Sequence, residues 1–295
     1  MIDVIVVGGG IAGLTAAIYI KRSGKEVLVI EKEACGGQLL SAPLVENFPG
    51  YMPLPGAELI DKVIEQVDAL GIRIEYTEVV GIGKYEDSWI VETESYDYCA
   101  HSVIIATGAS HKHIPNVEGD KVSYCAVCDG AFYKNKTVAV IGDGNSALQY
   151  SLMLSDICNK VWLCTWSDKL FGDNALIQRI QKTPNIEQIK FVNVQTFDYE
   201  RLYMKDLTKE NAEKVIKVDG VFVAIGQKPN TELVKNIAKL DKIGYIIADK
   251  MNIDEGLFVA GDCRMKDTTR QAITAASEGA IAAMEAVKYL NTKGE

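Results

Sequence analysis

Three observations in the sequence predict an α/β protein with two Rossmann-like domains of three layers each. An apolar run at residues 2–7 leads directly into a glycine-rich turn at 8–13. The same succession returns in the second half of the chain, at 137–147. The chain has 295 residues, 48% of them hydrophobic and 24% charged, which suffices for two ordinary globular cores.

The first repeat has the features of a dinucleotide-binding βαβ unit. A continuous apolar strand is typical of a parallel sheet that is buried on both faces. Gly8, Gly10 and Gly13 let the backbone approach a pyrophosphate at a helix N-terminus, and Glu31, 18 residues after Gly13, can accept a hydrogen bond from a ribose. A tight turn without a ligand is the alternative. The expected elements are a strand at 2–7, a helix from 14 to about 23 and a strand at 26–30.

The rest of the first half alternates further elements with one long loop. Residues 36–50 are rich in glycine and proline, and loops of this length are usually functional. Apolar residues at helical spacing predict a helix at 57–70. A plausible domain boundary follows at Pro115. The expected strands are 72–76, 79–82, 89–93 and 103–108.

The second repeat reproduces the spacing of the first. Gly8 and Glu31 are 23 residues apart, and so are Gly142 and Thr165, which indicates an internal repeat of a nucleotide-binding unit. Residues 202–217 are polar and ambiguous, and 227–230 are expected to be a turn where the chain crosses back. The possible second nucleotide site consists of Gly142, Gly144, Asn145, Ser146 and Ala147. The expected elements are strands at 137–141, 161–164, 221–226 and 256–262, with helices from 145 to about 154 and from 271 to about 290.

Between the two turns lies Cys125-Ala126-Val127-Cys128-Asp129-Gly130. Two cysteines at this spacing can close and reopen a disulfide, and the start of a helix acidifies a thiol. One alternative is a zinc site, which needs a second close pair roughly 15–20 residues on. A mixed site with His111 and His113 would leave Asp129 unexplained. The other alternative is two unrelated buried cysteines. We favour a redox pair that receives electrons from a bound cofactor.

Composition restricts the partners and the compartment. The net charge of −9 argues against nucleic acid or an anionic membrane as a partner. No apolar run approaches the ~18 residues of a membrane span, and no signal peptide precedes the first strand. Seven cysteines without a framework spacing suggest a cytoplasmic protein with one catalytic pair and no metal. The cysteines read as packing residues are Cys35, Cys99, Cys158, Cys164 and Cys263.

Seven motifs together carry a resemblance to a known family. Over nearly its whole length the chain resembles the low-molecular-weight, bacterial-type thioredoxin reductases. The order and spacing of the motifs are highly specific. They are Gly8-x-Gly10-x-x-Gly13, Gly36-Gly37-Gln38-Leu39, Glu46-Asn47-Phe48-Pro49-Gly50, Ala106-Thr107-Gly108, Cys125-Ala126-Val127-Cys128-Asp129-Gly130, Ala260-Gly261-Asp262 and Arg270-Gln271-Ala272.

The resemblance implies an FAD-binding domain split into residues 1–113 and 231–295. It implies an inserted pyridine-nucleotide-type domain at 114–230, which carries the cysteine pair, and a homodimer. Without the family, a solvated surface charge is the less favoured alternative for Arg270. The FAD-binding residues implied are Gly8, Gly10, Gly13, Glu31, Gly37, Gln38, Leu39, Asn47, Val80, Thr107, Gly108, Gly261, Asp262, Arg270, Gln271 and Ala272.

The resemblance also implies the roles of the redox residues. Cys128 is the sulfur that faces the flavin, Cys125 attacks the partner disulfide, and Asp129 is the proton donor. Electrons pass from FAD to this pair and then, through a mixed disulfide, to a thioredoxin-like protein. A rotation about the two crossings near Pro115 and 226–230 would expose the pair to that protein.

The second nucleotide site departs from the family. NADPH-dependent members have a His-Arg-Arg run and a further arginine where this chain has Thr165-Trp166-Ser167-Asp168, and only Lys169 is nearby. An NADH enzyme would have an acid at Thr165, and Asp143 brings a negative charge into the turn. Trp166 could still stack on an adenine. We therefore expect weak use of NADPH and NADH, or a different donor such as ferredoxin or a deazaflavin.

Two other functions use the same layout. A flavin-dependent dithiol oxidase would form a disulfide in a small molecule and pass the electrons to oxygen. A non-enzymatic redox sensor would bind a partner according to the state of its flavin and would not turn over thioredoxin.

Overall fold

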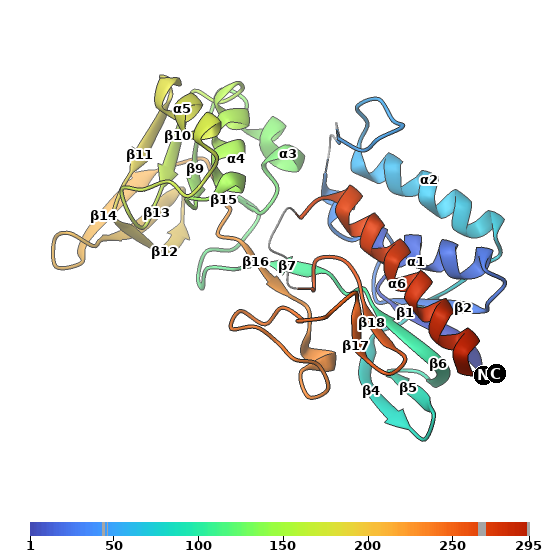
Figure 1. The fold of residues 1–295 in the computed structure, drawn as a ribbon. Coiled ribbons are helices and arrows are strands. Elements are labelled where there is room, and N and C mark those ends of the chain that lie inside the picture. The colour runs from blue at the N-terminus through green and yellow to red at the C-terminus, as the bar shows by residue number, and fades with distance from the viewer. Residues whose placement is uncertain (43–44, 46, 265–269, 294–295) are drawn as a thin grey trace. The chain divides into compact units, whose positions relative to one another are not determined.

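The chain folds into two compact units. The computed structural model describes residues 1–42, 45, 47–264 and 270–293, with the backbone alone at 41, 127 and 128. Unit 1 comprises Met1–Ser110 and Lys228–Glu295, and unit 2 comprises His111–Gln227 (Figure 1). Unit 2 is therefore an insertion in the sequence of unit 1. No helix among the described residues is long and apolar enough to cross a membrane.

Unit 1 is built on an eight-stranded sheet. The strand order is β17-β18-β6-β1-β2-β3, and β5 joins β6 to β4. The strands from β18 to β3 run parallel, as the apolar runs of the sequence predict. The elements are β1 (Ile2–Val7), α1 (Ile11–Arg22), β2 (Val27–Glu31), η1 (Gly37–Ser41), α2 (Gly56–Ala69), β3 (Arg73–Tyr76), β4 (Val79–Tyr85), β5 (Ser88–Thr93), β6 (Asp97–Ile105), η3 (Glu232–Val234), β17 (Asn252–Asp254), β18 (Leu257–Val259) and α6 (Ala272–Lys293).

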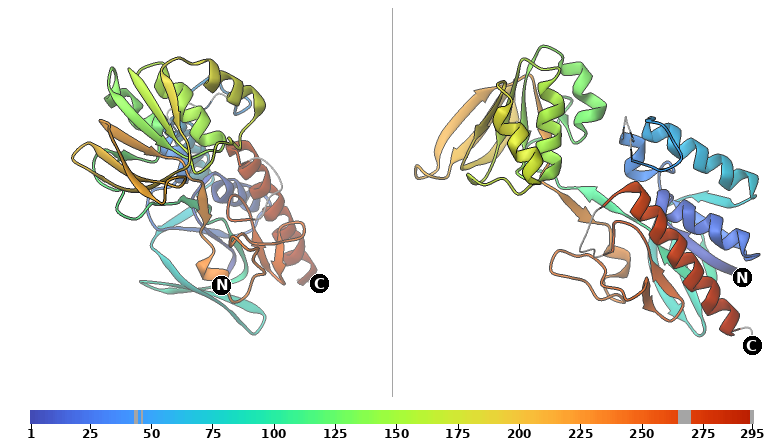
Figure 2. Two further views of the ribbon diagram at one scale, coloured as in Figure 1. Left: turned by 90° about the vertical axis from the view of Figure 1, so that its left-hand side faces the viewer. Right: turned by 45° about the horizontal axis from the view of Figure 1, so that its top comes forward.

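Alternate residues of the strands in unit 1 serve two different cores. Val4 and Val6 of β1 pack with α1 and α6, whereas Ile5 and Val7 pack with Trp89 and other residues on the opposite face. Figures 1 and 2 show α1, α2 and α6 together on one side of this sheet. The parallel sheet is thus covered on both faces, as a three-layer fold requires.

Glycines bring α1 close to its neighbours. A side chain at Gly13 would run into the carbonyl oxygen of Gly8, and one at Gly279 of α6 into that of Ala12. At its C-terminal end α1 is followed by Gly24, whose φ of +77° favours glycine, and Lys21 and Arg22 complement the helix dipole. These contacts hold the N-terminus of α1, and with it the glycine turn, in one place.

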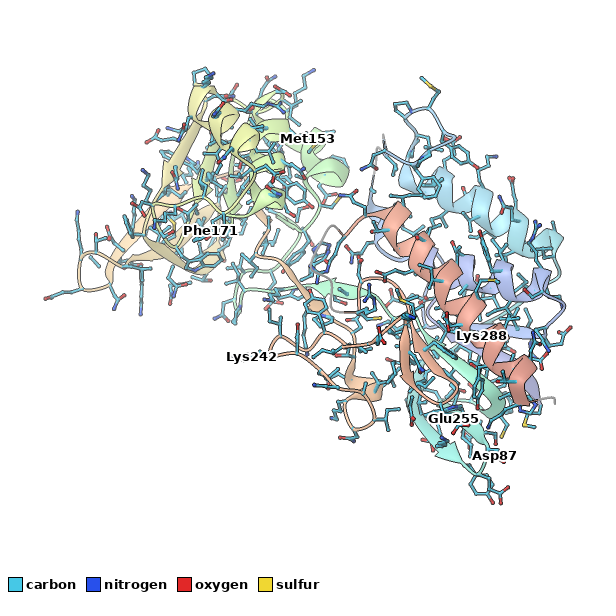
Figure 3. The ribbon with its side chains drawn as sticks, viewed as in Figure 1. Asp87, Met153, Phe171, Lys242, Glu255 and Lys288 are labelled. Carbon is cyan, nitrogen blue, oxygen red and sulfur yellow. The ribbon has the colours of Figure 1, made fainter. Side chains whose placement is uncertain are left out.

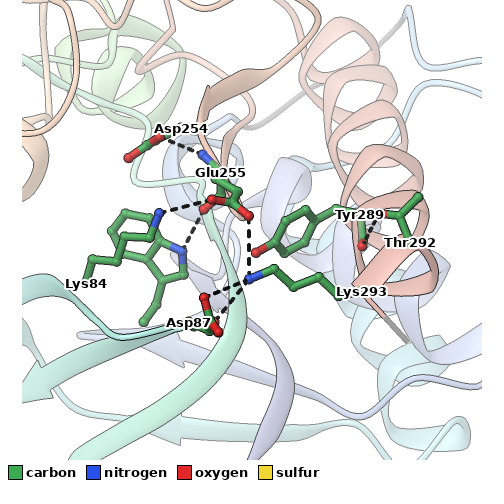
Figure 4. A network of polar contacts seen from close by, with 8 residues as sticks. Lys84, Asp87, Asp254, Glu255, Tyr289, Thr292 and Lys293 are labelled. Carbon is green, nitrogen blue, oxygen red and sulfur yellow. Dashed lines mark hydrogen bonds and ion pairs between the residues drawn. The ribbon is translucent and has the colours of Figure 1, made fainter. Parts of the chain in front are cut away.

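The C-terminal end of α6 is anchored by a polar network (Figure 4). The Nζ of Lys293 lies 3.6 Å from Oε1 of Glu255 and 3.8 Å from Oδ1 of Asp87. The indole N–H of Trp89 donates to the carbonyl oxygen of Glu255 at 3.1 Å. The network joins α6 to the β4–β5 hairpin and to the turn between β17 and β18.

Unit 2 repeats this plan around a smaller parallel sheet. Its strand order is β11-β10-β9-β15-β8, and an antiparallel sheet β12-β13-β14 accompanies it. The elements are β8 (Val122–Ser123), α3 (Ala126–Asp129), η2 (Gly130–Tyr133), β9 (Thr137–Ile141), α4 (Asn145–Ser155), β10 (Lys160–Cys164), α5 (Asn174–Lys182), β11 (Ile186–Ile189), β12 (Val192–Asp198), β13 (Arg201–Asp206), β14 (Ala212–Lys217) and β15 (Gly220–Val223).

The central strand of unit 2 also has two buried faces. Val138 and Val140 of β9 pack in the core that includes helix α4, whereas Ala139 and Ile141 pack against residues of β12 and β13. The α/β fold with two Rossmann-like domains is therefore confirmed.

Three segments differ from the expected elements. The ambiguous residues 202–217 fall in β13 and β14. Leu202 and Met204 of β13 are fully buried, whereas β14 is mostly exposed and is held by its pairing with β13. Residues 227–230 are not simply a turn: β16 (Gln227–Pro229) pairs with β7 (Ala109–His111) where the chain crosses between the units. Strand β6 begins at Asp97 rather than 103, since it pairs with both β1 and β5.

Candidate active site

The glycine turn of unit 1 leaves room for a ligand at the N-terminus of α1. Gly10 precedes the helix with φ −72° and ψ 176°, and a Cβ added there would meet no atom within 4 Å. Gly8, in contrast, has φ +109° and faces the carbonyl of Ala106, so it must be glycine for the fold itself. The free space at Gly10 beside unpaired helix N–H groups fits the pyrophosphate of a dinucleotide.

Glu31 lies at the end of β2 and contacts the same turn. Its Oε2 accepts the N–H of Gly9 at 2.6 Å, and its Oε1 accepts that of Glu33 at 3.0 Å. A carboxylate has about four acceptor sites, so Glu31 keeps capacity for a ribose hydroxyl. The Glu31 carboxylate thus stabilises the turn and can still accept a hydrogen bond from a ligand.

A cavity of about 300 Å³ opens beside Glu31. Val79 contributes to its lining, whereas Val80 does not and is 56% exposed, because neighbouring residues of a strand point to opposite sides. The lining residues from the sequence-predicted set are Gly8, Glu31 and Thr107. The others are Val7, Ile30, Lys32, Thr77, Glu78, Val79, Lys228, Pro229, Asn230, Glu232 and Leu233.

Two predicted FAD residues far apart in the sequence meet in unit 1. The side-chain N–H of Asn47 donates to Oε1 of Gln271 at 2.9 Å, although 224 residues separate them. Gln38 donates to the carbonyl of Ala109 at 2.8 Å. Gly37 and Leu39 belong to η1 with Gln38, and Ala272 is the first residue of α6. Glu46 lies outside the described residues.

Thr107 and Gly108 are held by a residue that the sequence analysis placed only in a turn. Asn230 donates from its side chain to the carbonyl of Thr107 at 2.9 Å and from its backbone to that of Gly108 at 3.0 Å. The hydroxyl of Thr107 donates to the carbonyl of Asn230. These mutual bonds fix the backbone that follows β6 against the backbone at Asn230.

The turn with Gly261 and Asp262 rests on a buried acid that the sequence analysis missed. Glu278 of α6 is 7% exposed; its Oε2 accepts the N–H of Gly261 at 2.9 Å, and its Oε1 accepts Nη2 of Arg264 at 2.8 Å. The one signal in the sequence for Glu278 was an acid on a helix face that otherwise consists mainly of alanine and glycine. Through its bond to the N–H of Gly261, Glu278 fixes the backbone next to Asp262.

Arg270 is placed by a second missed residue, Tyr245. The guanidinium carbon lies 4.2 Å from the centroid of the Tyr245 ring, which is 6% exposed. Within the described chain the Nε of Arg270 is buried and has no hydrogen-bond partner. Because native structures rarely leave a buried donor unpaired, a ligand atom is the natural acceptor. This orphan donor fits the FAD that the family implies, and it argues against a solvated Arg270.

The redox segment lies in unit 2 at the start of α3. Cys125 is disulfide-bonded, and its backbone N–H donates to the hydroxyl oxygen of Ser123 at 3.0 Å. The backbone N–H of Asp129 donates to the carbonyl of Cys125 at 3.1 Å, and the Asp129 side chain is partly buried. The side chain of Cys128 lies outside the description. Cys125 is thus a disulfide-bonded cysteine just before a helix.

The histidines near this segment bind a tyrosine. Nδ1 of His113 is 2.7 Å from the hydroxyl of Tyr124, and the ring of His111 stacks on Tyr124 at 5.9 Å. Burial, together with the neighbouring His113, lowers the pKa of His111. Among the described residues no three metal-binding side chains gather at one place.

The other cysteines divide into four buried thiols and one exposed thiol. Cys99 is exposed, so its interpretation as a packing residue is wrong: its side chain points away from the core side of the β5–β6 pair. Burial raises the pKa of the Cys35 thiol. It raises the pKa of Cys158 and Cys263 to about 11 and that of Cys164 to about 12. Buried thiols of this kind are unreactive.

The second glycine turn has the backbone of a nucleotide site with different surroundings. Gly144 precedes α4 and has free space, like Gly10. Oδ1 of Asn145 accepts the N–H of Asp173 at 2.7 Å, so this side chain is engaged by the chain itself. Burial raises the pKa of Asp143. Ser146 is exposed and Ala147 fully buried in α4.

The position of the expected ribose-binding acid is taken by a buried threonine. Thr165 is 1% exposed, and its hydroxyl donates to the carbonyl of Ser167 at 2.7 Å. Trp166 is 38% exposed. No arginine lies between Cys164 and Gln178, so the turn has no guanidinium of its own to bind a phosphate.

Comparisons with known proteins agree with this geometry. Residues 2–279 match the model of the pyridine nucleotide-disulphide oxidoreductases. A thioredoxin reductase of Treponema pallidum is 41% identical over 303 residues, with 98% of this chain and 97% of that protein covered. A 34.2 kDa protein in the rubredoxin operon of Clostridium pasteurianum is 37% identical over 306 residues, covering 99% and 98%.

A solved structure agrees as well. The thioredoxin reductase of Lactococcus lactis superposes with a TM-score of 0.88 at 34% identity, covering 99% of this chain and all of that one. The family implies FAD and a nicotinamide nucleotide as cofactors. The chain belongs to the pyridine nucleotide-disulphide oxidoreductases and is an FAD-dependent disulfide oxidoreductase of the thioredoxin reductase type.

Proposed function

We propose that this enzyme passes two electrons from FAD in unit 1 to a Cys125–Cys128 disulfide and on to the disulfide of a thioredoxin-like protein. The observation that supports this most directly is the oxidised Cys125 at the start of α3, with Asp129 one helical turn further on. The dipole at a helix start stabilises a thiolate, which is the attacking form in disulfide exchange.

The cysteine pair carries the exchange with the partner. When bound and reduced, FAD would supply the two electrons that break the Cys125–Cys128 bond, and two protons would complete the dithiol. The Cys125 thiolate then attacks the partner disulfide, and a mixed disulfide forms. The Cys128 thiolate attacks Cys125, which re-forms the internal bond and releases the partner as a dithiol. Asp129 holds the proton that each departing thiolate needs.

In unit 1, the chain binds and orients the cofactor. Gly10 leaves space for the pyrophosphate, Glu31 accepts from a ribose, and Arg270 donates its free Nε to the flavin end. The Asn47–Gln271 bond and the Glu278-supported turn at Asp262 hold the remaining side chains of this site in place. No part of this arrangement depends on the second turn.

The donor is proposed to differ from the NADPH of typical relatives. The second turn keeps open backbone at Gly144 but has no arginine and carries Asp143, so NADPH and NADH should both bind weakly. A reduced ferredoxin or a deazaflavin that reaches the flavin directly is the alternative donor. Each ~1.4 kcal/mol of lost phosphate binding lowers affinity tenfold.

We also propose a cytoplasmic homodimer. On α6, Ile273, Ile281 and Met284 are 39%, 43% and 53% exposed at helical spacing, and a second copy could cover them. Light scattering on the purified protein tests the dimer. Ile281→Glu with Met284→Glu should give a monomer, whereas Lys205→Glu, an exposed change in unit 2, should not.

Serine variants test the redox pair. Cys125→Ser and Cys128→Ser should each reduce the turnover of thioredoxin disulfide by at least about 10³-fold, because neither a mixed disulfide nor its resolution can occur without both sulfurs. Cys99→Ser is the control, since Cys99 is an exposed cysteine and carries no proposed role. Wild-type turnover in either of the first two variants would refute the relay.

An anaerobic titration tests the donor. The flavin absorbance is followed while NADPH, NADH, reduced deazaflavin or reduced ferredoxin is added to the oxidised enzyme. Fast, saturating reduction at micromolar NADPH, with preference over NADH, would contradict the proposal. Rapid oxygen consumption with a small dithiol would instead indicate a dithiol oxidase, and no thioredoxin turnover with any donor would indicate a sensor.

A further inference from the structure

A lysine-rich segment of unit 1 contributes to the lining of the cavity beside Glu31. Residues 228–250, here called the lysine lobe, contain five lysines and three acids in a chain whose net charge is −9. Figure 1 shows the lobe in orange between β16 and β17, and Lys242 is labelled on it in Figure 3. The lobe therefore has a net positive charge, unlike the chain as a whole.

Two of the three acids of the lobe, Glu232 and Asp241, are engaged, whereas Lys239 and Lys242 are not. Glu232 pairs with Lys228 at 3.2 Å and with Lys235 at 3.8 Å. Oδ1 of Asp241 accepts three backbone N–H groups of its own turn at 2.8–2.9 Å. Lys239 and Lys242 are exposed and make no ion pair with a described residue. Their positive charge is available to a partner.

Apolar side chains accompany these lysines. Ile243 is 62% exposed and Ile237 37% exposed, and both lie within a few residues of Lys239 and Lys242. Exposed aliphatic side chains among unpaired charges of one sign are characteristic of a protein-binding surface, where apolar contact supplies affinity and charge supplies steering. A small anion or a flat dye would gain nothing from contact with the two isoleucine side chains.

The inner side of the lobe contacts the residues that line the flavin site. The Asp241 turn places Tyr245 under Arg270, at 4.2 Å. Although burial raises the pKa of Asp241, its three backbone bonds and the nearby Arg270 lower it overall, so the turn keeps its charge at neutral pH. The N–H of Ile246 donates to the carbonyl of Cys263, next to Asp262, at 3.0 Å. The lysine lobe thus packs directly against the segments that carry Asp262 and Arg270.

We propose that the lysine lobe is the docking surface for a small acidic protein that delivers single electrons to the flavin. The inference rests on the proposed function, in which the second nucleotide turn is a poor entry for electrons. Electron tunnelling weakens steeply with distance, so a carrier must dock next to the flavin site. Two reduced carriers each lose one electron, and the flavin takes up both together with protons from water. The carriers leave oxidised.

Charge reversal on the lobe tests this proposal with a matched control. The test variant is Lys239→Glu with Lys242→Glu; the control is Lys205→Glu with Lys209→Glu, which changes the net charge equally on exposed residues of unit 2. The probe is an acidic bacterial ferredoxin, kept reduced, and stopped-flow absorbance follows the flavin. Dithionite reduces every variant as a check that the flavin is intact.

The lobe variant should be reduced by ferredoxin about tenfold or more slowly than wild type at low salt, and should lose most of its salt dependence. The control should stay within about twofold of wild type. Ile243→Ser should weaken saturation without changing the salt dependence. Dithionite reduction and the flavin spectrum should be the same in all four proteins.

Two different failures can be told apart. If ferredoxin reduces the wild type quickly and both double variants behave alike, the docking surface is wrong and the proposed donor class stands. If ferredoxin does not reduce the wild type at low salt while NADPH does, the proposed donor and the docking surface are both overturned.

Discussion

The two glycine turns have almost the same backbone and different surroundings. Gly10 and Gly144 each precede a helix with extended ψ, 176° and −179°, and each has free space where a side chain would be. Gly8 and Gly142 both have positive φ and face a strand carbonyl, that of Ala106 or Ala224. The shared geometry follows from one requirement: a strand must turn tightly into a helix against a parallel sheet.

What differs is the set of side chains around the turn. In unit 1 the strand after the helix ends in Glu31, which bonds the turn at 2.6 Å. In unit 2 the equivalent Thr165 is buried in a local bond, and Asp143 brings a negative charge instead. The comparison teaches that the turn provides a place for a phosphate, while neighbouring side chains decide which nucleotide is bound.

The largest expected effect comes from filling the two turns. Gly10→Val should fold, since a side chain there meets nothing within 4 Å, but should lose FAD because the pyrophosphate's space is taken. Gly144→Val should keep stoichiometric FAD and wild-type reduction of thioredoxin by dithionite-treated enzyme. The ratio of flavin to protein absorbance measures the FAD content of both variants. Stoichiometric FAD in a folded Gly10→Val protein would remove the basis of the comparison.

A contrasting substitution separates binding from folding. Gly13→Ala should yield little folded protein, because its Cβ would overlap the carbonyl of Gly8. If Gly13→Ala were instead as stable as the wild type in thermal unfolding, the close packing of α1 against its own turn would be in doubt.

The next prediction tests whether the side chains alone make the second turn a poor nucleotide-binding site. Trp166→Arg with Ser167→Arg should lower KM for NADPH by about ten- to a hundredfold and create a preference over NADH, since each charge-assisted bond to phosphate contributes about 1.5–3 kcal/mol before solvent screening. Trp166→Lys with Ser167→Gln gives a single point charge and should improve KM less. Equal, small effects from both pairs would mean that the backbone, too, is unsuitable.

A smaller effect concerns Asp143 and pH. Burial raises its pKa, so the protonated fraction in the folded enzyme increases as pH falls toward that value, and repulsion of a pyrophosphate weakens. Flavin reduction by NADH should therefore quicken as pH is lowered, and Asp143→Asn should be faster at neutral pH with this dependence removed. For stability the sign is opposite to the usual acid: the unfavourable charge is absent below the unfolded pKa and appears as pH rises through the folded pKa.

The smallest effect lies away from both turns. Lys293→Met removes the ion pairs of Figure 4 at the end of α6, where the Lys293 side chain is 30% exposed. Solvent-screened pairs of this kind contribute about 0.2–1 kcal/mol, so the melting temperature should fall by only a few degrees. FAD content and thioredoxin turnover should not change. A loss of FAD in this variant would show that α6 transmits strain to the site.

The repeated strand–turn–helix units were predictable because they depend on local pattern. Continuous apolar runs, glycines at fixed spacing and alternation along strands are read directly from neighbouring residues, and β1, β9, α1 and α4 appear where those patterns place them. The antiparallel pair β13–β14 was ambiguous because its outer face is polar, and only burial of Leu202 and Met204 against the central sheet identifies it as strand.

The sequence by itself determined the two glycine turns, the spacing of the cysteine pair and the missing arginines after β10. The tertiary structure alone decided which distant side chains support the cofactor site: Asn47 with Gln271, Tyr245 under Arg270, and Glu278 beneath Gly261. The physical reason is range. Backbone conformation follows from a few adjacent residues, whereas a contact across hundreds of residues exists only after the sheet and α6 have packed together.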